Sequence, residues 1–287
     1  YIEGNLLAYL GTLAATVLVW CINRKVMTGL IYNEINKVED TKVKTVSEYR
    51  FLERFGEVGE YMRLELKMLL RNKRCKASLR SVAMLVIIFS IILSFSSTYD
   101  HMKSFVQVYS FLGFGMVILI QLMGFEGNYI DGLMTRKESI KSLLTAKYYI
   151  YSLAEIIPLI LLIPAFVMGK ASLLGAVALI FLTTGPVYCI LFQLAVYNHK
   201  TVPLNESITG KQSMNTGMQM LISFGLFIVP TTLYGTLPML LGQTWAYIVI
   251  LIIGLGFTLT SPMWINNVYV RFMQRRYENM EGFRDSK

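Results

Sequence analysis

Apolar residues along this chain are gathered into long runs that are separated by polar connections. Seven of these runs approach the length of about 20 residues that a helix needs to cross a bilayer. They are residues 5–22, 81–97, 105–124, 148–168, 171–197, 218–241 and 245–269. The pattern therefore predicts an all-α polytopic membrane protein with about seven transmembrane helices.

The basic residues of the connections predict which side of the membrane each connection faces. With seven spans, 25 of the 27 Lys and Arg residues fall in alternate connections, and only Lys103 and Lys170 lie on the opposite side. Cytoplasmic connections are enriched in Lys and Arg. We therefore expect a multi-pass protein of the plasma membrane, which is the inner membrane in a bacterium. The N-terminus of this chain would lie outside, and the tail, residues 277–287, would lie in the cytoplasm.

Residues 57–76, ahead of the second span, have the pattern of an amphipathic helix that lies in the membrane interface. Its charged residues recur at spacings of three and four, and apolar residues occupy another side. The charged strip consists of Glu60, Arg63, Lys67, Arg71 and Arg74. Glu65 is an exception, because it falls on the apolar side. The basic end of this segment suits anionic headgroups, so membrane lipids are expected partners. A solvated helix that merely precedes the span is the alternative.

Residues 126–147, between the third and fourth spans, predict a short cytoplasmic helix with mixed charge. The segment is too polar to span, yet its apolar residues have near-helical spacing. Its candidate partner-binding residues are Glu126, Asp131, Leu133, Arg136, Lys137 and Lys141. A helix that projects between two spans can serve as a docking site. An ordinary loop helix without a partner is the alternative.

The sixth run differs from the others because Pro230, Pro238 and Gly242 interrupt it. Such a run predicts either a broken, re-entrant hairpin or a kinked span with a short loop, and the sequence leaves both open.

Composition agrees with a membrane protein. Of the 287 residues, 54% are hydrophobic and 16% are charged, whereas soluble domains contain about 25% charged residues. The net charge of +9 follows from the basic cytoplasmic connections, so no nucleic acid is expected as a partner.

The sequence contains no pattern typical of a catalytic or metal site. Its three cysteines and two histidines lack zinc-ligand spacing. No His-Glu-x-x-His occurs, and no convincing serine-hydrolase motif is present. We therefore expect neither an enzyme nor a bound metal.

Glu155 is the one acidic residue well inside an apolar run. A carboxylate at this depth is costly and faces an interior or a cavity. Three interpretations stay open: it pairs with a polar neighbour, it lines a substrate path, or it reaches the cytoplasmic interface.

Together these features resemble the type-2 permease domain of ATP-binding-cassette exporters, over about residues 57–276. In that family an acid lies near the end of a span, an acid and a leucine follow one or two turns later, and a leucine pair and a lysine come next. The matching residues here are Glu126, Asp131, Leu133, Leu143, Leu144 and Lys147. Where the family often has a proline, this chain has Arg136, Lys137 and Glu138.

The resemblance implies that residues 57–76 form an elbow helix and that residues 126–147 form a coupling helix, which docks into a groove of a separate ATPase subunit. ATP and magnesium would bind that partner, because no Gly-x-x-x-x-Gly-Lys-Ser/Thr occurs here. The implied function is transport by alternating access, with export as the direction, in a homodimer or a fused pair of permease halves. An ion-coupled secondary transporter and a structural subunit of a membrane complex are the alternatives.

The first span, residues 1–23, lies outside this six-span unit and is followed by a predicted cytoplasmic linker, residues 24–56. Its exit, from Trp20 to Asn23, is similar to the exit of the last span, from Trp264 to Asn266. One interpretation is that it is the last span of an upstream half. Chance similarity of two helix ends is the other.

Overall fold

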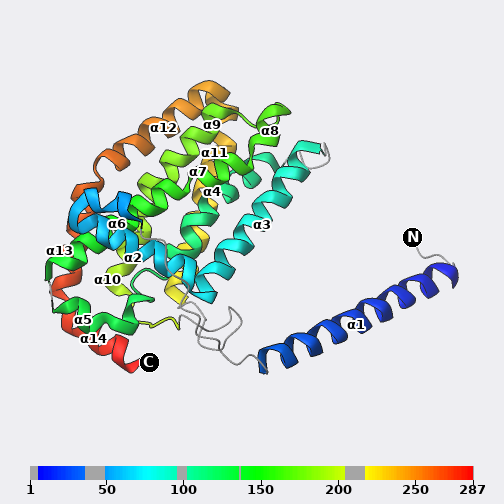
Figure 1. Ribbon diagram of the computed structural model, residues 1–287. Coiled ribbons are helices and arrows are strands. Elements are labelled where there is room, and N and C mark those ends of the chain that lie inside the picture. The colour runs from blue at the N-terminus through cyan, green and yellow to red at the C-terminus, as the bar shows by residue number, and fades with distance from the viewer. Residues whose placement is uncertain (1–5, 36–48, 96–101, 136, 204–216, 287) are drawn as a thin grey trace. The chain divides into compact units, whose positions relative to one another are not determined.

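The computed structural model describes residues 6–35, 49–95, 102–135, 137–203 and 217–286. These residues are largely helical, and none of them forms a strand. The chain divides into two compact units, Tyr1–Glu48 and Tyr49–Lys287. The first unit contains α1 (Leu6–Ile35), and the second contains the other helices (Figure 1).

The helix α1 is continuous over 30 residues and is longer than the predicted span 5–22. The predicted span is thus part of a longer helix, and the boundary at residue 23 stays a prediction. No proline lies between Asn23 and Ile35, so nothing ends the helix where the apolar run ends. Of the predicted 24–56 linker, residues 36–48 lie outside the described residues, and η1 (Arg50–Phe55) forms its last part.

Among the described residues, four helices are long and apolar enough to cross a membrane, and a bent pair of helices gives a fifth crossing if it is one span. The four are Lys73–Phe95, Ile140–Leu161, Leu173–Tyr197 and Gly217–Leu241. The bent pair consists of α12 (Gln243–Leu259) and α13 (Ser261–Gln274), which meet at 52°. A further apolar helix, α4 (Lys103–Leu119), has 17 residues. The chain is thus a helical, multi-pass membrane protein, and the described helices account for four or five of the seven predicted crossings.

Prolines lie at the irregular places in these spans, because proline lacks the N–H of a helical hydrogen bond. The span Ile140–Leu161 consists of most of α6 (Lys137–Ala154) and of α7 (Ile156–Leu161), and α8 (Ile163–Val167) comes next. Pro158 and Pro164 lie just beyond the two breaks. The span Leu173–Tyr197 consists of α9 (Leu173–Leu182), a π-helical turn η4 (Thr183–Val187) that contains Pro186, and α10 (Tyr188–Tyr197).

The helix α11 (Gly217–Leu241) is continuous through Pro230 and Pro238. The re-entrant hairpin that the sequence allowed is therefore not adopted. The reversal is made instead by Gly242, whose φ of 80° lies in the left-handed region, and α12 begins at the next residue. The sixth run is thus a span with a short loop.

Two boundaries near the predicted cytoplasmic segments also differ from prediction. The helix predicted for residues 57–76 is α2 (Gly56–Arg71), and it ends because Asn72 adopts an extended conformation with ψ 131°. Arg74 therefore belongs to α3 (Lys73–Phe95) and is buried. The segment predicted as a tail is the helix α14 (Arg276–Asp285), which packs against the short elements η3 (Glu126–Tyr129) and α5 (Ile130–Met134).

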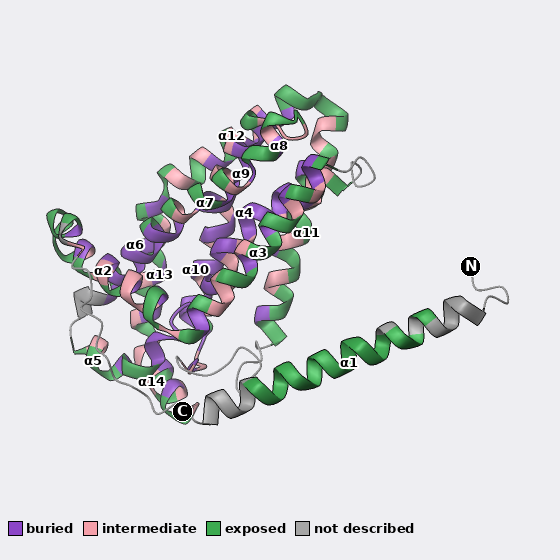
Figure 2. Ribbon diagram, turned by 45° about the vertical axis from the view of Figure 1, so that its right-hand side comes forward, coloured by how far each residue is buried: buried purple, intermediate pink, exposed green. Residues whose placement is uncertain are grey.

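Within the second unit, buried residues gather between the helices, and the outer sides of α3 and α11 are exposed (Figure 2). The exposed residues on these two helices include Met84, Ile88 and Ile91 on α3 and Leu221, Phe224 and Ile228 on α11. Large apolar side chains on an outer surface match lipid rather than water. The two helices therefore present lipid-facing surfaces.

The helices α9 and α12 pack together closely because glycines let their backbones approach. A Cβ atom added at Gly254 would lie 2.5 Å from the carbonyl carbon of Phe181, and one added at Gly185 would lie 2.5 Å from the carbonyl oxygen of Gly254. Both obstacles are backbone atoms, which cannot move aside without shifting a helix. Gly256, two residues further along α12, has nothing within 4 Å of its Cβ position.

We expect Gly254→Ala to lower the free energy of unfolding by about 1–3 kcal/mol, because the added methyl group overpacks the α9–α12 contact. The measurement is the apparent unfolding temperature of the purified protein in detergent. Gly256→Ala is the matched control and should leave that temperature near the wild-type value. Equal effects of the two substitutions would contradict the close backbone contact.

Candidate functional site

The candidate site is a row of three polar residues along the span Ile140–Leu161. Lys147 and Tyr151 lie four residues apart on α6, and Glu155 lies four residues further, at the junction with α7. This spacing places the three side chains on one side of the span. All three are buried. Buried polar groups in a membrane protein need partners, and each of the three has at least one.

Lys147 lies between two buried carboxylates. Its Nζ is 2.7 Å from both carboxylate oxygens of Glu65 on α2 and 2.8 Å from Oε1 of Glu126 in η3. The hydroxyl group of Tyr151 donates a hydrogen bond of 2.8 Å to Oε1 of Glu65. We call these four residues the Lys147 cluster. Their exposed fractions are 2% or less.

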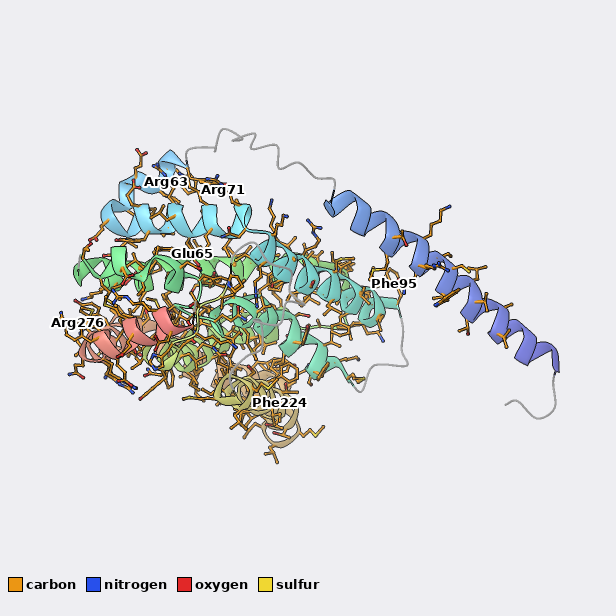
Figure 3. All side chains as sticks on the ribbon, turned by 90° about the horizontal axis from the view of Figure 1, so that it is seen from below. Arg63, Glu65, Arg71, Phe95, Phe224 and Arg276 are labelled. Carbon is orange, nitrogen blue, oxygen red and sulfur yellow. The ribbon has the colours of Figure 1, made fainter. Side chains whose placement is uncertain are left out.

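Three separate segments bring the cluster together. The helix α2 packs on α6, and Figure 3 shows Glu65 on the side of α2 that faces α6. Glu126 arrives through a turn after α4, in which Met123 has a φ of 66°. Such a left-handed conformation is unfavourable for a residue other than glycine. Met123 is completely buried, so surrounding contacts hold the turn in place.

The cluster contains two carboxylates and one ammonium group, and this imbalance affects Glu65. Burial away from water raises the pKa of Glu65, and the nearby Glu126 carboxylate raises it further. The Lys147 ammonium group acts in the opposite direction, through its charge and its hydrogen bonds. The net result is a pKa above the ordinary value of 4.5. A proton retained on Glu65 would make the cluster neutral.

Glu155 has a separate partner. The hydroxyl group of Tyr188 donates a hydrogen bond of 2.6 Å to its Oε1 and lies 3.3 Å from the carbonyl oxygen of Tyr151. Gly115 on α4 leaves the space for this hydroxyl group, because a Cβ there would lie 2.1 Å from it. The π-helical turn η4 immediately precedes Tyr188; such turns often occur at functional sites. Of the three interpretations of Glu155, the structure thus shows internal pairing.

The middle of the 126–147 segment is more exposed than its ends. Asp131 and Lys141 are exposed, and Leu133 is half-buried. Arg136 lies outside the described residues, and Lys137 begins α6 with a side chain that is not described. Glu126, which was predicted to contact a partner, has an exposed fraction of 0%. That prediction is wrong for this structure, because Lys147 holds the Glu126 carboxylate inside.

The C-terminal helix α14 supports the 126–147 segment from one side. Nη2 of Arg284 is 2.8 Å from Oδ1 of Asp131, and the ring of Phe283 packs against Gly127. Thr201 donates a hydrogen bond of 3.0 Å to the carbonyl oxygen of Phe283. These contacts fix the position of α5 without covering Asp131, whose side chain keeps an exposed fraction of 48%.

The remaining residues of the charged strip lie on the outer side of α2 or toward η1. Arg63 is 3.3 Å from Glu53 and 3.6 Å from Glu60. Lys67 is half-buried, and Arg71 is exposed. Figure 3 shows Arg63 and Arg71 on the side of α2 away from α6.

Sequence reasoning missed Glu65, Lys147, Tyr151 and Tyr188 as members of one site. Two signals pointed to part of it: Glu65 stood on the apolar side of its helix, and Lys147 stood at the edge of an apolar run. No group of three or more His, Cys, Asp or Glu that could hold a metal ion occurs among the residues that the structure describes.

Comparison with protein families gives one match. Residues 1–286 match the family of unknown function DUF5687. The chain belongs to DUF5687. The match includes α1 as well as the second unit, so both parts are features of this DUF5687 protein. No curated protein and no solved structure matches it.

We expect Lys147→Met to lower the free energy of unfolding by about 3–5 kcal/mol, because it leaves two buried carboxylates without a counter-charge. Glu65→Gln should lower the free energy of unfolding by less, since one carboxylate and one ammonium group remain. The apparent unfolding temperature in detergent checks this order. Lys141→Met, at an exposed position of the same helix, is the control and should change stability by no more than about 0.5 kcal/mol. A larger loss of stability for Glu65→Gln than for Lys147→Met would contradict the view that Lys147 neutralises the buried carboxylates.

A second prediction concerns pH. Because the folded-state pKa of Glu65 is raised, the folded protein binds more protons than the unfolded chain above pH 4.5, and the stability contributed by this group falls as pH rises. The unfolding temperature of the wild type, relative to that of Glu65→Gln, should therefore decline as pH rises from 4.5 through the raised pKa of Glu65. A wild type that gains stability relative to the variant over this range would show that the pKa of Glu65 is lowered instead.

Proposed function

We propose that this DUF5687 protein is the permease subunit of an ATP-binding-cassette transporter. It would move its substrate across the membrane by alternating access, driven by a separate ATPase subunit that binds the 126–147 segment. Hydrolysis of ATP, with its magnesium ion, takes place on that partner. The permease acts as a homodimer or as one half of a fused pair, and export is the expected direction.

One observation supports this proposal above the others: the 126–147 segment is fixed at both ends and exposed in its middle. Glu126 and Lys147, which flank it, form an ion pair of 2.8 Å, while Asp131, Thr135 and Lys141 are exposed. A segment of this kind is suited to transmit force, because a displacement of its exposed part cannot be absorbed by flexible ends.

The Lys147 cluster connects the 126–147 segment to the helices on which such a force would act. Glu126 lies in η3, which follows α4, and Lys147 is part of the span Ile140–Leu161. Glu65 is part of α2, and α3 follows α2 in the chain. Movement of the 126–147 segment by an ATPase would therefore act on three spans at once. A coordinated shift of several spans against the others is what alternating access requires.

The proposal includes the full topology predicted from the sequence. Seven crossings result when α1 and α4 are added to the four long spans and the bent pair. The N-terminus of the chain is then outside, α14 is cytoplasmic, and α2 is an elbow helix at the cytoplasmic surface of the plasma membrane. The distribution of Lys and Arg over the connections supports this orientation.

A specific observation favours a second candidate, an ion-coupled transporter. Glu155 is completely buried in a span, and its Oε2 has no hydrogen-bond partner among the described residues. A buried carboxylate with a free oxygen is suited to bind and release a proton during transport. In this alternative, Glu155 is the coupling group and no ATPase is required.

The test is to purify the full chain from its native membranes and to identify the subunits that accompany it. We expect a subunit with a Gly-x-x-x-x-Gly-Lys-Ser/Thr motif and ATPase activity in the complex. Thr135→Trp and Lys141→Glu alter the exposed part of the 126–147 segment and should lower the amount of co-purified ATPase by on the order of tenfold or more.

Lys170→Glu is the matched control, since the proposed topology places Lys170 on the opposite side of the membrane. It should retain the ATPase subunit. A wild-type preparation that contains no nucleotide-binding subunit would contradict the proposal and favour the ion-coupled alternative. Equal loss with Lys170→Glu would show that the 126–147 segment is not the docking site.

A further inference from the structure

A cavity of about 370 Å³ lies between α3, α4 and α11, apart from the Lys147 cluster. Its volume lies within the usual range for sites that bind small molecules, about 300–1,000 Å³. Twelve residues line it, and none of these twelve is acidic. One of them, Arg74, is a buried cation with an exposed fraction of 4%.

The polar lining residues are gathered at one end of the cavity. Arg74 and Ser78 lie in the first two turns of α3, Gln121 lies just after the end of α4, and Ser223 lies in the second turn of α11. The start of α3, the end of α4 and the start of α11 face the same side of the membrane in an alternating topology. One end of the cavity is therefore polar and basic.

The rest of the cavity is largely apolar and extends toward the middle of the spans. From Arg74, the lining continues along α3 through Ser78 to Val82, at steps of four residues. The other walls are formed by Leu112, Met116 and Val117 of α4 and by Phe227 of α11, with the ring of Tyr109. The cavity thus has a charged end and an apolar end, as an amphiphile does.

Two of the helices that form the cavity have apolar outer surfaces. The helices α3 and α11, which form two of its sides, carry large exposed apolar residues, and Phe224 of α11 is at the edge of the bundle in Figure 3. Lys73 and Lys76 are exposed on α3 close to Arg74. Exposed cations at this level attract anionic lipids of the leaflet.

We propose that this cavity binds an anionic phospholipid from the surrounding leaflet, with its phosphate at Arg74 and an acyl chain along the apolar wall. A guanidinium group has five N–H donors, so it can bind phosphate oxygens in a bidentate manner while it keeps another contact. Ser78, Gln121 and Ser223 supply further polar groups at the same end. The site requires a membrane protein but no ATPase, so it is independent of the proposed function.

The test uses the full chain, purified in detergent and stripped of native lipid. Binding of phosphatidylglycerol and of phosphatidylcholine is measured by native mass spectrometry. We expect the wild type to retain phosphatidylglycerol preferentially. Arg74→Gln should weaken its binding by on the order of tenfold, since a charge-assisted contact to phosphate is lost. Arg80→Gln removes the same charge from an exposed position outside the cavity and should leave binding near the wild-type level.

A second pair of variants fills space without changing charge, and it decides the question if Arg74→Gln does not fold. Ser223→Trp places a large side chain at the polar end of the cavity and should abolish retention of phosphatidylglycerol. Thr232→Trp, at an exposed position of the same helix and outside the cavity, should not.

Four results would overturn the proposal. They are equal binding of phosphatidylcholine, equal losses with Arg74→Gln and Arg80→Gln, unchanged binding in Ser223→Trp, and displacement of the lipid by glycerol phosphate at the same concentration. The last result would show that the site recognises a soluble phosphate and not a lipid.

Discussion

The second unit depends on how one buried cation, Lys147, is balanced. A lysine with an exposed fraction of 1% cannot stay charged inside the protein unless carboxylates replace the water it has lost. Glu65 and Glu126 do so, and they come from α2 and from the turn after α4. The electrostatic requirement of a single side chain thus joins three segments that are distant in the sequence. Tyr151 completes the arrangement with its hydrogen bond to Glu65.

This arrangement gives the 126–147 segment a defined position and leaves its middle exposed. The ion pair between Glu126 and Lys147 fixes the ends, and α14 contacts Asp131 and Gly127 from one side. Elsewhere the bundle is less tightly packed. The cavity at Arg74 lies beside α11, and an apolar cavity of about 330 Å³ lies between α11 and the span Leu173–Tyr197. The second unit therefore combines a fixed 126–147 segment with a helix, α11, that has space on two sides.

The sequence predicted the parts of the fold that depend on local pattern. The apolar runs 81–97, 171–197 and 218–241 lie within or closely match the long helices of the structure, because a span must be continuous and apolar. The site was predicted less well. Glu126 was interpreted as a surface residue, and the partner of Glu155 was unknown, since Tyr188 is 33 residues away. The pairing of Lys147 with Glu65 joins residues 82 positions apart. Such pairings depend on helix packing, which no local pattern specifies.

The position of α14 has a consequence for biosynthesis. This helix follows every span of the second unit in the chain. Phe283 and Arg284 nevertheless support α5, which precedes three of the long spans and the bent pair. During translation, α5 therefore leaves the ribosome long before its support exists. The surface at Asp131 is complete only after the downstream helices and α14 have been synthesised. A subunit that recognises this surface would thereby select chains whose synthesis is finished.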